Sequence, residues 1–162
     1  MDHLWSPWRY RYLVEVKSSR QCIFCAMAAE PARDEENLVV FRGQANFVVL
    51  NRFPYTNGHL MIVPYHHSPD LAGLDPAAAA ELIALTRDAE RHIRALYKPD
   101  GLNIGMNIGE AAGAGIAGHI HMHVLPRWSG DSNFMTTIGE TRILPEELPV
   151  TWQRLRKAFH AS

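Results

Sequence analysis

The pattern of hydrophobic and polar positions is most regular in the stretch Gly118–Arg127. From His119 onward histidine occupies every second position as far as residue 123, and Ile120, Met122 and Val124 fill the gaps. Alternation with a period of two is typical of a β-strand, whose successive side chains point to opposite faces. The apolar set should therefore pack into a core, while three imidazoles line the opposite face with Cα atoms roughly 6.6 Å apart. A helix would scatter the same imidazoles around its axis.

Other hydrophobic patterns predict the remaining strands of an α+β fold. Short apolar-rich segments at 37–42 and 45–50, separated by Gly43-Gln44, predict a β-hairpin. Residues 59–64 predict a third strand, and residues 101–109 predict a strand that pairs antiparallel with the histidine strand. We expect these segments to form a mainly antiparallel sheet of about five strands.

Two helices are expected to pack on this sheet. The longer one begins at Asp75-Pro76, because aspartate is a favoured N-cap and proline a favoured first helical residue, and it stops at Pro99-Asp100-Gly101. Its apolar residues at helical spacing are Leu82, Leu85, Ala89, Ile93 and Leu96. The segment 145–162 predicts a C-terminal helix after Pro149, suited to a core or subunit contact. The residues at helical spacing there are Trp152, Leu155, Arg156 and Phe159.

The composition fits one domain that spans residues 1–162. The chain has 47% hydrophobic and 20% charged residues, which is ordinary for a globular protein. Its formal net charge of −1 gives no electrostatic case for nucleic-acid binding. No apolar run suits a membrane span and no signal peptide opens the chain, so we expect a cytoplasmic protein. The aromatic-rich residues 1–20 are expected to form an arm that packs on the domain or a lid that contacts substrate.

Three roles are open to a row of alternating imidazoles. They can form a solvated strand face, or they can bind a metal, since imidazole is a common ligand. Alternatively, one imidazole attacks phosphorus while its neighbours orient it or manage protons. A cupin-like metal site needs a carboxylate soon after the histidines, and Val124-Leu125-Pro126-Arg127 provides none.

The segment before the histidines favours the third role. It contains Gly109, Gly113, Gly115 and Gly118, so its backbone can approach a ligand closely and adopt the positive φ values of an anion-binding nest. A P-loop is excluded, because no Gly-Lys-Ser/Thr ending is present and a strand follows. A loop of this kind alone is most often a flexible connection. Beside three histidines it predicts a phosphate cradle next to a nucleophile.

The run His119-Ile120-His121-Met122-His123-Val124-Leu125 resembles the signature of the histidine triad (HIT) family of nucleotide hydrolases and transferases. The opening Leu4-Trp5-Ser6-Pro7-Trp8-Arg9 and the stretch 128–135 are similar to the branch that contains diadenosine tetraphosphate phosphorylases. The resemblance implies one HIT-like domain and a homodimer with a joined sheet. Gly115 stands where many triad hydrolases carry Gln or Ser. Retention of the third histidine argues against the sugar-phosphate nucleotidyltransferase branch, which has Gln there.

Cys22-Ile23-Phe24-Cys25 is a second candidate for chemistry. A redox pair would need a thioredoxin-like βαβ setting, which the following segments do not supply. A structural zinc site would need two further ligands, and His67 and His119 would complete a closed Cys2His2 set. The family resemblance implies such an arrangement, with the first triad histidine as a ligand. Two buried free thiols are the alternative, and no organic cofactor is expected.

The resemblance also assigns roles to single residues. It implies that the middle histidine, His121, attacks phosphorus, that Asn51 bonds ribose hydroxyls and that His59 supports the triad. Asn51 by itself is equally suited to a turn. His123 is expected to orient the phosphate or handle the leaving-group proton. Asn107, at the mouth of the glycine loop, is expected to donate to a phosphate oxygen or to cap a turn.

The predicted activity is cleavage of a dinucleoside polyphosphate, such as diadenosine tetraphosphate, or of a related purine nucleotide. The reaction would pass through a nucleotidyl-histidine intermediate, with phosphate or water as acceptor. Backbone N–H groups around Gly113–Gly118 are expected to take up oxyanion charge, at roughly 3–4 kcal/mol for each donor, and Arg127 is expected to face away. The alternatives are a nucleotide-binding module with little catalysis, a nucleoside phosphoramidate hydrolase, and an enzyme whose metal is held by the three histidines.

Overall fold

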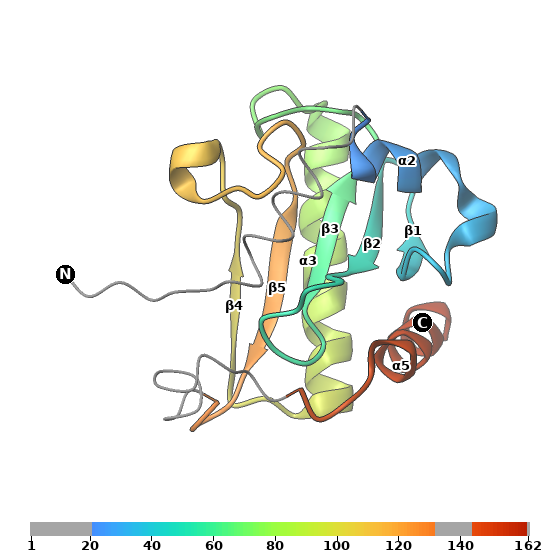
Figure 1. The fold of residues 1–162 in the computed structure, drawn as a ribbon, viewed down its shortest axis with the longest axis vertical. Coiled ribbons are helices and arrows are strands. Elements are labelled where there is room, and N and C mark those ends of the chain that lie inside the picture. The colour runs from blue at the N-terminus through green and yellow to red at the C-terminus, as the bar shows by residue number, and fades with distance from the viewer. Residues whose placement is uncertain (1–20, 132–143, 162) are drawn as a thin grey trace.

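The computed structural model describes residues 21–131 and 144–161. In chain order its elements are α2 (Ile23–Ala29), the short 3-10 helix η1 (Pro31–Arg33), β1 (Val39–Arg42), β2 (Asn46–Leu50), β3 (Leu60–Pro64), α3 (Pro76–Tyr97), β4 (Gly101–Gly105), the short 3-10 helix η2 (Glu110–Ala112), β5 (Met122–Arg127) and α5 (Leu148–His160). Figure 1 shows the strands side by side, with α3 running behind them. The predicted arm at residues 1–20 lies outside the described residues.

The structure confirms the predicted antiparallel sheet. Its five strands follow the order β1-β2-β3-β5-β4, and each pairs antiparallel with its neighbour. The histidine strand β5 therefore lies between β3 and β4, as expected for the strand at 101–109. Met61 of β3 and Gly105 of β4 flank His123 in this register.

The histidine strand begins at Met122, later than the alternation predicted. The N–H of Ile120 instead bonds the carbonyl oxygen of Ser68, 2.7 Å away in the loop before α3. His119 and His121 therefore lie in the segment that leads into β5. The alternation of side chains does not reveal whether the main chain pairs with a strand or with a loop, because the side chains alternate in both cases.

The helix α3 forms for the reasons given by its sequence. Oδ1 of Asp75 accepts the N–H of Ala77 at 2.8 Å, and Pro76 is the first helical residue. Lys98 ends the helix in the left-handed conformation, with φ of 45°. The helix is amphipathic, and its apolar side packs on β2, β3 and β5.

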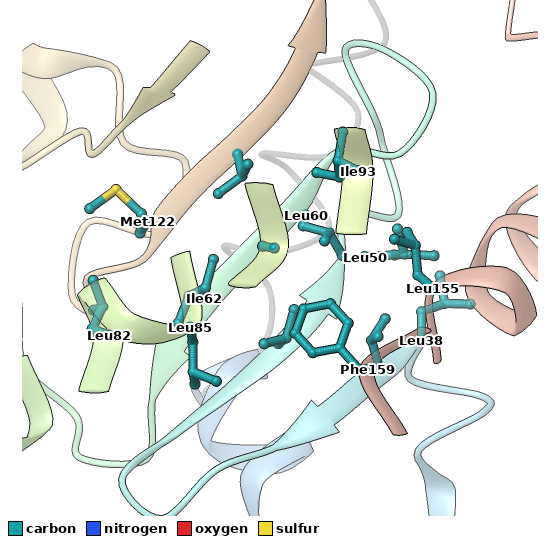
Figure 2. Close-up of a cluster of buried hydrophobic side chains, with 14 of the residues drawn as sticks. Leu38, Leu50, Leu60, Ile62, Leu82, Leu85, Ile93, Met122, Leu155 and Phe159 are labelled. Atoms are coloured by element: carbon teal, nitrogen blue, oxygen red, sulfur yellow. The ribbon is translucent and has the colours of Figure 1, made fainter. Parts of the chain in front are cut away.

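A hydrophobic cluster fills the space between the sheet, α3 and α5 (Figure 2). The strands and the segment before β5 contribute Val40, Val48, Leu50, Leu60, Ile62, Ile120, Met122 and Val124. The helix α5 contributes Trp152, Leu155 and Phe159, which confirms the predicted C-terminal helix and gives it a role in the core. His92 of α3 is also buried here, with its ring centroid 4.5 Å from that of Phe159.

The opposite face of the sheet carries a second, smaller cluster. Phe24 and Met27 of α2 pack there on residues of β1, β2 and β3: Val39, Phe47, Val49, Met61 and Val63. Because His123 pairs with Met61, the three histidines belong to this face. The apolar and imidazole sets thus separate as predicted, but α2 covers the imidazole face and shields it from water.

The two edges of the sheet differ. At β1, the N–H of Val39 donates to the oxygen of Asp34 and its own oxygen accepts Nε1–H of Trp152 at 2.8 Å, and α5 packs beside this strand. We call this the covered edge. At β4, Asn103, Ile104 and Gly105 are exposed, and no described segment pairs with the outer side. No helix in the described part of the chain is long and apolar enough to cross a membrane.

Candidate active site and metal-binding cluster

His121 lies on the face that α2 covers and is 6% exposed. Its Nδ1 is 2.9 Å from the main-chain oxygen of His119, and a carbonyl oxygen can only accept, so Nδ1 carries the proton. Nε2 therefore has the lone pair that a nucleophile needs. Burial lowers the pKa of His121, which favours this neutral ring, although the hydrogen bond to His119 acts in the other direction.

A chain of hydrogen bonds that begins at the main chain orients His123. The N–H of Tyr55 lies 3.3 Å from Nδ1 of His59, so this nitrogen accepts and the proton of the neutral ring is on Nε2. That Nε2 is 2.9 Å from Nδ1 of His123 and donates to it. The neutral His123 ring then carries its own proton on Nε2. Because the ring centroids of His121 and His123 are 4.8 Å apart, a proton donor stands beside the nucleophile.

His119, the first triad histidine, faces a different group. Its Nε2 donates to the oxygen of Pro64 at 2.9 Å, so its Nδ1 is an acceptor. That nitrogen is 3.4 Å from Sγ of Cys22, 3.6 Å from Sγ of Cys25 and 3.2 Å from Nδ1 of His67. All four ligand atoms lie within 4.8 Å of one another, and neighbouring ligands of a tetrahedral zinc ion are roughly 3.3–3.8 Å apart. The cluster can therefore hold one metal ion.

The electrostatics of this cluster suit a cation. Burial lowers the pKa of His119 and so favours the neutral ring that a metal requires. Burial, followed by the hydrogen bond and charge of Cys22, raises the pKa of Cys25. Two adjacent thiolates are unfavourable without a positive charge between them, and a metal ion supplies that charge. The Pro64 carbonyl is the kind of outer partner that fixes the tautomer of a ligating imidazole.

A pocket opens between the loop after β2, the glycine loop and α2. Its lining residues are Phe24, Asn51, Phe53, Tyr55, Met61, Asn107, Gly113, Gly115, Ile116, His121 and His123. The structure thus brings six of the predicted site residues to one place: Asn51, Asn107, Gly113, Gly115, His121 and His123. His59 lies behind His123, and Gly118 lies beside the metal-binding cluster, where an added Cβ would be 3.6 Å from Nε2 of His67.

Sequence reasoning did not identify the apolar half of the pocket. Phe24 is the most informative of these residues, because its ring centroid lies 5.1 Å from that of His121 and 5.4 Å from that of His119. Its position between two cysteines was the available signal, since a residue flanked by two ligands stays close to the whole ligand set. The other missed residues are Phe53, Tyr55, Met61 and Ile116.

Asn51 has both features that its sequence context allowed. Its Oδ1 accepts the N–H of Phe53 at 2.9 Å, which is the expected turn. The same side chain lines the pocket. With the oxygen engaged in the turn, the NH2 group is the part of Asn51 that can donate to a ligand.

The glycine loop is partly bonded to itself. Gly109 and Gly113 have φ of 82° and 89°, the positive values expected for a nest. The N–H of Gly113 donates to the oxygen of Glu110, and that of Ala114 donates to Gly109. Within the described residues, the N–H groups of 115–118 donate to no main-chain oxygen. The predicted set of anion-binding amides therefore narrows to the second half of the loop.

Arg127 was expected to face away from the triad, and the burial pattern of β5 contradicts this. Residues 123, 125 and 127 alternate together against the buried residues of the strand. Arg127 still lies outside the pocket, because Asp131 holds its guanidinium at the far end of β5, with N–O distances of 2.6 and 2.8 Å. Its positive charge is therefore paired locally.

The antiparallel sheet, the histidine run and the adjacent pocket define a known class of protein. Residues 32–130 match the HIT domain, and the chain belongs to the HIT (histidine triad) family. The chain is 43% identical over 154 residues to the AP-4-A phosphorylase of Mycobacterium tuberculosis (strain CDC 1551 / Oshkosh), an alignment that covers 91% of this chain and 79% of that protein.

Solved structures support the same assignment. A Zn-bound histidine triad family protein from Mycobacterium smegmatis superposes with a TM-score of 0.71 at 29% identity, covering 87% of this chain and 94% of that one. A hypothetical histidine triad nucleotide-binding protein from Sulfolobus tokodaii superposes with a TM-score of 0.69 at 25% identity, covering 86% and 93%.

Proposed function

We propose that this protein cleaves diadenosine tetraphosphate and similar dinucleoside polyphosphates, with inorganic phosphate as the acceptor. The observation that carries the proposal is the pairing of a lone pair on Nε2 of His121 with a proton on Nε2 of His123, beside a pocket lined by donors. The similarity to AP-4-A phosphorylase supports the choice of substrate and acceptor.

In the first step, Nε2 of His121 attacks the α-phosphorus of one AMP unit. The bond between that phosphorus and the bridging oxygen breaks, ATP leaves, and AMP remains on the ring. Nε2–H of His123 donates a hydrogen bond to the departing oxygen, and ATP leaves as its anion, so the neutral ring keeps its proton. Nδ1–H of His121 stays bonded to the oxygen of His119, which stabilises the positive charge that the ring gains.

In the second step, an oxygen of inorganic phosphate attacks the same phosphorus. The phosphorus–nitrogen bond breaks, ADP leaves, and His121 recovers its lone pair. The same N–H of His123 donates a hydrogen bond to the attacking oxygen of the acceptor phosphate, whose own proton passes to water. Asn107 and the N–H groups of 115–118 are the proposed donors to phosphate oxygens, and Asn51 is the proposed donor to a ribose hydroxyl.

We also propose that Cys22, Cys25, His67 and His119 hold zinc. The donor set and its spacing fit a closed structural site, and a relative of this fold is described as Zn-bound. Bound there, zinc supplies rigidity and leaves the phosphorus chemistry to the imidazoles. The set requires reduced thiols, which supports the proposed cytoplasmic location.

A homodimer is the proposed assembly. The outer side of β4 has no pairing partner among the described residues, and Ile104 at this edge is 45% exposed. Pairing of this edge with a second copy would satisfy the open backbone groups and bury apolar surface. We also propose that residues 1–162, including the N-terminal arm, form a single HIT-like domain.

The test is product analysis after incubation with diadenosine tetraphosphate, with and without inorganic phosphate. ADP plus ATP in the phosphate buffer supports the proposal, and AMP plus ATP identifies water as the acceptor. Absence of products in both buffers overturns the assignment. Retained AMP binding would then indicate a binding module, and turnover of adenosine phosphoramidate alone would indicate a phosphoramidate hydrolase. His121→Asn is the matched inactive control.

A further inference from the structure

His119 belongs to two networks at once. Its side chain contributes Nδ1 to the cluster of Cys22, Cys25 and His67. Its main-chain oxygen accepts Nδ1–H of His121 at 2.9 Å. The position of that oxygen fixes both the tautomer and the direction of the nucleophilic ring, and the imidazole of the same residue is held by the cluster on one side and by a main-chain oxygen on the other.

Phe24 forms a second connection between the two groups. It lies between the two cysteines, is 2% exposed, and contacts the rings of both His119 and His121. A buried aromatic ring on one side of an imidazole limits the rotamers that the imidazole can adopt. The placement of Phe24 depends on α2, because α2 carries this residue to the imidazole face.

The helix α2 needs an external anchor. It has only seven residues and no side-chain hydrogen bond at its N-cap, Cys22. Helices this short are unstable by themselves, so tertiary contacts must hold them. Cys22 and Cys25 anchor its first turn through the metal-binding cluster, and Phe24 and Met27 anchor it through apolar contacts.

We infer that metal binding at the Cys22/Cys25/His67/His119 cluster positions the nucleophile, His121, through the main chain of His119 and the ring of Phe24. The inference rests on the proposed function of His121. Phe24 and His119 are positioning residues, since they act on the reaction through the orientation of His121. The metal-binding cluster thus orients the nucleophile in addition to stabilising the fold.

The inference predicts a change in kcat rather than in KM. Asn51 and Asn107, which are proposed to bind the nucleotide, are not in the ligand set and follow β2 and β4, outside α2 and the segment 119–121. A displacement of about 1 Å at a reacting group costs on the order of 100-fold in rate. Metal removal should therefore lower kcat by about 10- to 100-fold and change KM by less than about threefold.

The experiment compares the zinc-loaded protein, the same protein after chelation, and two zinc-loaded variants. Phe24→Leu keeps the four ligands and removes the ring, and Ile23→Val is the control between the same cysteines. Zinc content, thermal unfolding, kcat and KM are measured for each, and the imidazole resonances of His121 are followed in protein labelled with 15N at histidine. Reloading the chelated protein with zinc or cadmium provides the rescue.

Three results support the inference. Chelation moves the His121 resonances toward a mixture of tautomers in a protein that is still folded, zinc or cadmium restores them, and Phe24→Leu lowers kcat about 10-fold with full zinc content. Unchanged His121 resonances and kcat in the folded, metal-free protein overturn it. If chelation unfolds the chain, Phe24→Leu decides through the His121 resonances, because Phe24 also lines the pocket. Resonances and a kcat equal to those of Ile23→Val overturn the inference, and so does a loss of kcat with unchanged resonances.

The same measurements separate this inference from the proposed function. If the zinc-loaded protein releases no nucleotide product, the proposed function fails. The His121 resonances then still report whether the metal-binding cluster orients this ring.

Discussion

Each triad imidazole is held in one tautomer by a different acceptor or donor. His119 donates from Nε2 to the oxygen of Pro64, and His121 donates from Nδ1 to the oxygen of His119. His123 accepts at Nδ1 from His59. Each ring therefore has a different role. His119 directs the lone pair of Nδ1 to the metal-binding cluster, His121 has its lone pair on Nε2 in the pocket, and His123 offers an N–H at Nε2.

Replacement of His121 tests the nucleophile. His121→Gln should lower kcat by about 1000-fold or more, because no other residue in the described pocket offers an imidazole lone pair beside a proton donor. Mass spectrometry after acid-free quenching should detect AMP on the wild-type chain and none on the variant. AMP attached to the variant would place the nucleophile elsewhere.

Replacement of His123 tests the proton donor. His123→Asn should lower kcat by about 100-fold or more for substrates whose leaving oxygen needs the hydrogen bond from Nε2–H. Two aryl esters of AMP with different leaving groups distinguish the loss of this interaction from a general loss of structure. The ratio of the rates on the nitrophenyl and phenyl esters should be far higher for the variant than for the wild type, because a nitrophenolate leaves readily without a hydrogen bond to its oxygen. An equal loss on both esters would assign His123 an orienting role only.

The sequence predicted the identity of these residues but not their states. Histidine at every second position was enough to place three imidazoles on one face. The tautomers depend on Pro64, which is 55 residues from His119 in the chain, and on the N–H of Tyr55. Such contacts are set by the packing of the loops, which a local pattern does not contain.

At the scale of elements, the N-cap residue Asp75 determines where α3 begins and helps to stabilise the helix. Asp75→Ala removes the side-chain acceptor for the N–H of Ala77 and should lower the free energy of unfolding by about 1 kcal/mol. Urea unfolding measures the change. Asp75→Asn, which retains an acceptor oxygen, is the control and should stay near the wild-type value.

The contact between α3 and α5 should depend on pH through His92. Burial lowers the pKa of His92, with a further contribution from Arg91, so the folded state prefers the neutral ring. The unfolded chain binds the proton more readily, so this contribution to stability is present above about pH 6.5 and is lost as the pH falls below it.

His92→Leu removes the ionisable group from this contact. The variant should therefore lose less unfolding free energy than the wild type between pH 7.5 and pH 5.5, in matched urea titrations. Burial also lowers the pKa values of His119 and His121, which contribute with the same sign, so some pH dependence remains. Equal slopes for the two proteins would contradict a buried neutral His92.

Elements whose own residues carry a clear periodicity and clear end signals were predicted well. Elements whose limits depend on contacts with distant segments were not. The long helix, the hairpin and the C-terminal helix each carry their own periodicity and boundaries. The start of β5 did not follow its pattern, because Ile120 pairs with Ser68 in a loop. The helix α2 was also missed, since its seven residues are held by the metal-binding cluster and by the sheet rather than by helical periodicity.

At the scale of the molecule, the open edge at β4 should control assembly. Ile104→Lys places a charge on the edge strand and should convert the proposed dimer into a monomer in sedimentation velocity runs. Val150→Lys, on α5 beside the covered edge, is the control, since Val150 is similarly exposed at 44% against 45%. A wild-type chain that sediments as a monomer would remove the proposed joined sheet.

The covered edge at β1 limits what such an assembly can become. A sheet with two open sides can add copies at both ends and grow into a filament. Here Asp34 and Trp152 occupy the outward main-chain groups of Val39, so only one side is left for recruitment. We therefore expect association through the sheet to stop at a symmetric pair, so a higher concentration should increase the fraction of dimer without forming filaments.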